Sequence, residues 1–138
     1  MRTRHKALVW IVRPASRGLE VLLLQRPEFR GGGLHPVTGK ADRGETLRAT
    51  ALREAREETG LEGVLLDLGF RHEFVAAKPA KKETRCIEHA WLLTVAAGSE
   101  PALSDEHVAA RWVPAIEAAA LLEWAAHRQS LALALGKT

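Results

Sequence analysis

Three glutamates stand close together in a helix-forming stretch of this 138-residue sequence. Glu54, Glu57 and Glu58 are at positions i, i+3 and i+4, so a helix places their carboxylates on one face within a single turn. Arg53 can relieve part of the repulsion between them through Glu57 at i+4. A hard divalent cation prefers oxygen ligands and commonly shares them with substrate phosphates. The spacing therefore favours a metal site, and the alternative is a glutamate-rich helix face that is merely solvated.

The residues around these glutamates follow a longer pattern. The stretch 39–61 resembles the Nudix box, G-x5-E-x7-R-E-U-x-E-E-x-G-U, in which U is an apolar residue. By chance alone, a match at every fixed position has a probability on the order of 10⁻⁸ to 10⁻⁹ per starting position. The fixed positions are filled by Gly39, Glu45, Arg53, Glu54, Glu57, Glu58 and Gly60, and the two apolar positions by Ala55 and Leu61.

This resemblance implies both a fold and an activity. Nudix hydrolases carry the box as a loop, a helix and a second loop on a mixed sheet, and they hydrolyse a nucleoside diphosphate linked to a further group. We therefore expect an α/β fold, specifically a Nudix-type α/β/α sandwich with a mixed β-sheet. We expect one Nudix hydrolase domain over residues 1–138, with Mg²⁺ (or Mn²⁺) as its cofactor.

The resemblance also assigns expected roles to the box residues. It implies that Glu54, Glu57 and Glu58 ligate the metal ion. Gly39 occupies the family's tight loop, where a backbone carbonyl is often a further ligand, although many members have two glycines there and this chain has Thr38 before Gly39. The remaining two fixed residues have structural counterparts in the family, which hold the loop against the helix: Glu45 and Arg53.

Two acids are candidates for the general base that takes a proton from the attacking water. One is Glu57, which could face a metal-bound water. The other is Glu106, which precedes Trp112 by six residues, a spacing found in several family members. Asp105 could substitute for Glu106, and the alternative for both is an ordinary exposed loop acid. Two cations, Arg26 and Lys40, stand where substrate phosphates should lie, unless they are simple surface cations.

Periodicity and turn residues predict the elements that position this site. Residues 46–59 are rich in helix formers, with Asp42 or Thr46 as the cap and Gly60 as the residue that ends the helix. After Pro114, helical spacing predicts one helix, or two with a break near His127, with an apolar stripe that includes Ile116 and Trp124. Strands are expected at 7–12, 19–25, 64–77, 86–95 and 109–113, with a turn at 13–18, a bulge at Gly69 and a charged connection at 78–85.

Composition and charge limit the class of protein. The chain has 20 basic and 17 acidic residues, and the basic ones are spread out, which disfavours nucleic acid as the partner and suits a small nucleotide. Apolar content of 46% supports a packed core, and one cysteine supplies no disulfide framework. No apolar run is long enough to span a bilayer. We expect a soluble, cytoplasmic protein without membrane contact, which could form a homodimer through its apolar C-terminal helix.

The substrate within the family is the least determined property. The absence of tyrosine and the late position of Pro79 disfavour dinucleoside polyphosphates and ADP-ribose. The run 35–40 and the tail from Arg111 are similar to the branch that hydrolyses dATP and dihydroneopterin triphosphate. The expected reaction therefore converts a (deoxy)nucleoside or pterin triphosphate to a monophosphate and pyrophosphate. The alternatives are a non-catalytic nucleotide-sensing Nudix-like module, or a hydrolase of ADP-ribose, dinucleoside polyphosphates or capped RNA 5′ ends.

Overall fold

Strand β1 (Arg2–Ala15) runs through the centre of the sheet and has three hydrogen-bonded neighbours. Along one edge it pairs in parallel with β6 (Lys81–Thr94). Along the other edge it pairs antiparallel with β4 (Val37–Lys40) near its start and with β2 (Gly18–Gln25) near its end. Since parallel and antiparallel pairs occur together, the sheet is mixed, as the sequence predicts.

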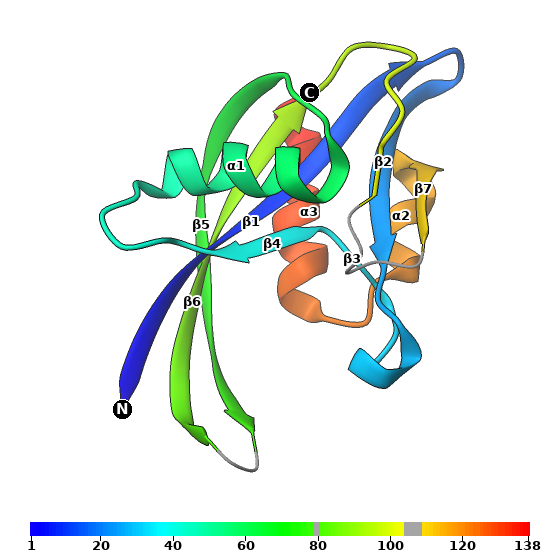
Figure 1. Cartoon of the computed structure of the whole chain (residues 1–138). Helices are drawn as coiled ribbons and strands as arrows, with labels where there is room; N and C mark the ends of the chain where they lie inside the picture. Colours follow the sequence, from blue (N-terminus) through cyan, green and yellow to red (C-terminus); the bar gives the residue numbers. More distant parts are fainter. Residues whose placement is uncertain (79–80, 104–108) are drawn as a thin grey trace.

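The computed structural model describes residues 1–78, 81–103 and 109–138. The sheet has the order β3-β2-β1-β6-β5, with β4 beside β1 and β7 beside β2 (Figure 1). Its remaining strands are β3 (Leu34–His35), β5 (Val64–Lys78) and β7 (Ala109–Pro114). The helices are α1 (Leu47–Thr59), α2 (Ala115–Ala118) and α3 (Ala125–Gly136), with short 3₁₀ helices η1 (Glu28–Arg30) and η2 (Ala119–Leu121).

Side chains of β1 alternate between two hydrophobic cores, one on each face of the sheet. Ala7, Val9 and Ile11 belong to the core that contains Ala51 and Ala55 of α1. Their neighbours in the chain point the other way, into the core that contains residues of α3: Leu8, Trp10 and Val12 meet Leu131 and Ala134. Figure 1 shows α1 and α3 on opposite sides of the strands. The predicted α/β/α sandwich is confirmed.

Helix α1 begins and ends where its capping residues predict. The Thr46 Oγ1 atom accepts a hydrogen bond from the Ala49 N–H at 3.1 Å, so Thr46, and not Asp42, is the N-cap. Gly60 follows the helix with a φ of 72°, a left-handed conformation in which glycine costs least. The box helix is therefore fixed at both ends by local chemistry.

Several strands are longer than the sequence predicts. β1 continues through Arg13 and Pro14, so the predicted turn at 13–18 is wrong in its first half. Most of the charged stretch at 78–85, expected as a connection, belongs to β5 and β6. There the Arg85 guanidinium donates to Glu73 at 2.6 Å, and such pairs let charged residues occupy exposed strands. The register shift between Asp67 and Arg71 confirms the bulge around Gly69.

The C-terminal segment also differs from expectation. The helical segments are interrupted between Leu121 and Ala125, before the predicted break near His127. Ile116 and Trp124 are 95% and 63% exposed, so their place in one buried stripe was wrong. Leu122 and Trp124 have extended backbone, so the helical spacing of side chains does not continue across this break. None of the described helices has both the length and the apolarity needed to cross a membrane.

Replacement of Ser130 by alanine should destabilise the fold. The Trp10 Nε1–H donates to the Ser130 Oγ at 2.8 Å, and both residues are fully buried. Since the variant leaves a buried donor without its acceptor, we expect the free energy of unfolding to fall by about 1–3 kcal/mol in urea denaturation. Ser16→Ala, in the exposed β1–β2 turn, is the control. A Ser130→Ala protein as stable as that control contradicts this account.

Candidate active site

Helix α1 presents its three box glutamates to different surroundings. Ala51 and Ala55 pack against the sheet, and Glu58 lies next to that side and is only 5% exposed. The side chain of Glu54 is 15% exposed, whereas that of Glu57 is 57% exposed. The carboxylate of Glu58 is therefore buried, that of Glu54 is mostly buried, and that of Glu57 is exposed. Glu57 is the most accessible of the three to water.

The guanidinium of Arg53 joins these carboxylates to the segment that precedes the helix. Its Nε and Nη2 atoms donate to the two carboxylate oxygens of Glu45, at 2.8 and 2.9 Å. Its Nη1 atom donates to Glu54 Oε1 at 2.8 Å and to Glu57 Oε2 at 3.1 Å. Nη2 also donates to the carbonyl oxygen of Lys40 at 3.0 Å. A single side chain thus contacts the end of β4, the loop before α1, and α1 itself.

The electrostatics of this network favour its ionised form. The hydrogen bonds from Arg53, from the backbone N–H of Asp42 and from the hydroxyl of Thr50 lower the pKa of Glu45 to about 2. The same contact with Glu45, together with that of Glu54, raises the pKa of Arg53, although burial acts in the opposite direction. The Glu45–Arg53 pair is therefore charged at neutral pH.

Gly39 lies in a strand, and the expected tight loop at this position was wrong. It belongs to β4 and pairs with Ala7 of β1. A Cβ atom on this residue would overlap the side chain of Glu54, so a glycine is needed here to let the carboxylate approach the backbone. Because Gly39 has no side chain, the β4 backbone and the Glu54 side chain are in direct contact.

The donor set around Arg53 suits a divalent cation in its chemistry. Glu54, Glu57 and Glu58 supply carboxylate oxygens, the ligands that Mg²⁺ prefers, and a positively charged nitrogen of Arg53 already lies between two of them. Among the described residues, no group of three or more His, Cys, Asp or Glu side chains is yet arranged to hold a metal ion. The guanidinium contacts one oxygen of Glu54, Oε1, and one oxygen of Glu57, Oε2.

The two expected phosphate-binding cations lie in different places. Lys40 contacts the Arg53 network through its carbonyl, and its side chain lines a pocket beside β1. Arg26 follows β2, and its backbone N–H donates to the carbonyl of Gly33 at 3.2 Å. The charge of Arg26 acts on His127 of α3, whose pKa is lowered mainly by burial. Of the other expected site residues, Glu106 and the neighbouring Asp105 lie outside the described residues.

Two contributors to the site were missed from the sequence. Asp42 donates its backbone N–H to Glu45 Oε1 at 3.0 Å, and the Thr50 hydroxyl donates to the same atom at 2.7 Å. Both residues occupy variable positions of the box pattern, so the pattern gives no signal for them. Their hydrogen bonds fix the Glu45 carboxylate in the orientation that Arg53 requires.

Replacement of Glu45 by glutamine should remove a pH dependence of stability. The folded-state pKa of about 2 lies below the ordinary value, so the ionised carboxylate stabilises the fold above about pH 4.5, and this stabilisation is lost as the pH falls through about 2. We expect the stability advantage of the wild type over Glu45→Gln to be constant near neutral pH and to shrink below about pH 4 in denaturant titrations. Glu62→Gln, an exposed change, is the control. An advantage that persists unchanged to about pH 2.5 contradicts the assignment.

Known proteins resemble this chain over most of its length. The family model for the NUDIX domain matches residues 2–134. A bis(5'-nucleosyl)-tetraphosphatase [asymmetrical] of Mus musculus is 39% identical over 112 residues, covering 77% of this chain and 71% of that protein. An octanoyltransferase of Myxococcus xanthus is 35% identical over 113 residues, covering 82% of this chain, and the chain spans only 30% of that protein's length.

A solved structure extends the likeness to the whole fold. The E. coli dihydroneopterin triphosphate pyrophosphohydrolase is 26% identical, with a TM-score of 0.78, and the match covers 100% of both chains. The complete box pattern, the family model over nearly the whole chain and the murine relative at 39% identity agree with one another. The chain therefore belongs to the Nudix family.

Proposed function

We propose that this chain hydrolyses a nucleoside diphosphate-linked substrate with a divalent metal ion, Mg²⁺ or Mn²⁺. The observation that carries the proposal is the convergence of box carboxylates on one cationic centre beside the backbone of β4. Glu54 and Glu57 are held at 2.8 and 3.1 Å from the same Arg53 nitrogen, and Glu54 contacts Gly39. A site built in this way concentrates negative charge where a cation and a phosphate chain can share it.

In this proposal Glu54, Glu57 and Glu58 hold the ion, with the carbonyl of Gly39 as a further donor. When bound, the ion neutralises phosphate charge and lowers the pKa of a water molecule. Arg53 and Glu45 have a positioning role, since they hold β4 and α1 together and leave one face of the carboxylates for the ion. Two of the box carboxylates are shielded, and the third is open to solvent.

The proposed general base is Glu57, because its side chain is the most exposed of the three and can meet an attacking water. It would accept the proton of that water as the water attacks phosphorus. Glu106 remains the second candidate on the strength of its spacing from Trp112. Arg26 and Lys40 remain the proposed cations for the substrate phosphates, and Lys40 has the firmer support because it adjoins the Arg53 network.

Within this reaction, we infer that the substrate carries three or more linked phosphates. One candidate is a (deoxy)nucleoside or pterin triphosphate, cut to a monophosphate and pyrophosphate. It is supported by the run 35–40 and by the E. coli relative at 26% identity. The second candidate is a dinucleoside tetraphosphate, supported by the murine relative at 39% identity, against which the absence of tyrosine is a weaker argument.

Replacement of Glu57 by glutamine tests the metal and base roles. The variant keeps the size of the side chain and loses its negative charge, so we expect the rate to fall by at least about 100-fold while the fold persists. Glu62→Gln removes the same charge from an exposed residue just beyond α1 and should keep the wild-type rate. Circular dichroism would confirm that both variants are folded. A Glu57→Gln variant that keeps the wild-type rate contradicts the proposed site.

A substrate panel with Mg²⁺ at mildly alkaline pH separates the candidates. The panel holds dATP, dihydroneopterin triphosphate, diadenosine tetraphosphate, ADP-ribose and a capped oligonucleotide, with products resolved by chromatography. We expect turnover of a substrate with three or more phosphates, and loss of that turnover when a chelator removes the metal ion. Turnover of ADP-ribose or capped RNA alone contradicts the inferred substrate class. Nucleotide binding without any turnover would identify a sensing module instead.

A further inference from the structure

A pocket of about 340 Å³ beside the start of β1 is lined mainly by cations. Arg2 and Arg4 belong to β1, whereas Lys40 and Arg43 belong to the end of β4 and the loop that follows. The term "basic pocket" is used below for the site formed by these four residues. Its volume lies within the range of about 300–1,000 Å³ that is typical of small-ligand sites.

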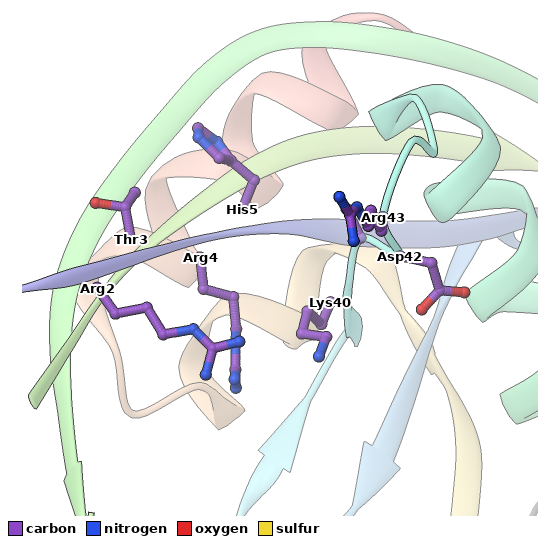
Figure 2. A pocket seen from close by; sticks show the side chains of 8 residues that line it. Arg2, Thr3, Arg4, His5, Lys40, Asp42 and Arg43 are labelled. Carbon is purple, nitrogen blue, oxygen red and sulfur yellow. The ribbon is translucent and has the colours of Figure 1, made fainter. Parts of the chain in front are cut away.

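Strand geometry places the side chains of Arg2, Arg4 and Lys40 on the α3 face of the sheet. Trp10 of β1 points into the core that contains α3 residues, and Arg2 and Arg4 share its alternation. Lys40 is paired in register with Lys6, which belongs to the same row, so its side chain lies on that face too. Figure 2 shows the ends of these three cationic side chains on one side of β1.

This placement separates the basic pocket from the box carboxylates. Gly39, which contacts Glu54, pairs with Ala7, a residue of the core on the α1 face. Lys40 is the next residue of β4, so its side chain points to the opposite face. An anion in the basic pocket and a metal ion at the box carboxylates would therefore lie on different faces of the sheet, and each site can be filled without the other.

Within the described part of the chain, the positive charge of the basic pocket is not compensated. None of the ion pairs between described residues involves any of its four cations. In β6, Arg2 pairs with Thr84. Arg4 pairs with Cys86, so neither arginine has an acid as its strand partner there. The Nε atom of Arg4 is buried and has no hydrogen-bond partner among the described residues, and a buried charged donor without a partner points to an anionic ligand.

Two acids lie close to this row of cations, and both are held by other residues. Asp42 lines the pocket, but its carboxylate is 3.5 Å from Arg53 Nη2 and extends away from the β1 arginines (Figure 2). Glu88 is the strand partner of Lys6, and its carboxylate oxygens lie 3.6 Å from Lys6 Nζ and 3.0 Å from His72 Nε2. Neither acid is therefore available as the counter-ion of the basic pocket.

We propose that the basic pocket is a second anion-binding site, separate from the substrate site, and that it takes a compact oligophosphate. Guanidinium groups donate paired hydrogen bonds to phosphate oxygens, and several linked phosphates supply the negative charge that four cations require. The cations line one pocket, which suits a compact anion better than a nucleic acid backbone, whose charge is distributed along its length. The proposal goes beyond the proposed function, because it concerns a second ligand and does not depend on hydrolysis.

Binding of inorganic tripolyphosphate, measured by calorimetry without divalent cations, tests the proposal directly. Under these conditions the box carboxylates repel the anion. We expect the double variant Arg2→Gln/Arg4→Gln to bind at least about tenfold more weakly than the wild type. The control Arg17→Gln/Lys137→Gln removes the same charge from exposed residues outside the pocket and should bind as the wild type does. Thermal unfolding would confirm that both double variants are folded.

Two further titrations test the separation of the sites and the source of the anion. The Glu57→Gln variant changes a residue of α1, on the other face of the sheet, so we expect it to bind tripolyphosphate within about twofold of the wild type. Adenosine triphosphate that binds as tightly as tripolyphosphate would identify the phosphate tail of a nucleotide as the ligand. Much weaker binding of the nucleotide would identify a free inorganic anion, and both results support the site.

Equal binding of tripolyphosphate by the wild type and the Arg2→Gln/Arg4→Gln variant, or no binding by either, overturns the proposal. It is also overturned if the variant weakens binding of an RNA oligonucleotide without a 5′ phosphate as much as that of tripolyphosphate. A large change of affinity in Glu57→Gln contradicts the separation of the two sites. The proposed function gives the charge of Lys40 to the substrate phosphates, and Lys40→Gln decides its place: weaker tripolyphosphate binding assigns it to the basic pocket, and unchanged binding removes it from there.

Discussion

The guanidinium of Arg53 is the interaction on which the candidate site depends. It contacts Glu45, Glu54, Glu57 and the carbonyl of Lys40, and these groups come from three consecutive segments of the chain. The positive charge of the guanidinium reduces the repulsion between these carboxylates. Only arginine has a planar fork with enough donors for this arrangement, because lysine offers a single nitrogen on a flexible stem.

Strand β4 contacts a different group of charged residues on each face of the sheet. β4 has one residue, Gly39, against the α1 carboxylates, and the next residue, Lys40, has its side chain among the cations near the start of β1. Because successive residues of a strand point to opposite faces, the box carboxylates and the Lys40 side chain lie on opposite faces of the sheet.

The sequence predicts some of this structure well, for physical reasons. α1 has a polar cap, a helical apolar stripe and a terminal glycine, all of them local signals, and the box fixes residue types at each chemical position. β3 and β4, in contrast, have two and four residues and are too short for a pattern of alternation to emerge. That Arg2 and Arg4 lie on the same face of a strand can be inferred only once β1 is known to begin at Arg2. The stripe through Ile116 and Trp124 fails because the helix is interrupted between them.

The parallel pairing of β1 with β6 constrains the order in which the molecule can assemble. Arg2 pairs with Thr84 and His5 pairs with Ile87, so the paired residues are far apart in the sequence. During synthesis the first strand leaves the ribosome long before its parallel neighbour exists, so the β1–β2 and β1–β4 pairs and α1 can form before β6 is made. Until β6 is complete, one edge of the central strand presents unpaired backbone groups, the kind of surface to which another chain can add a strand. Closure of that edge is a long-range, slow event, and it is the step at which aggregation competes with folding.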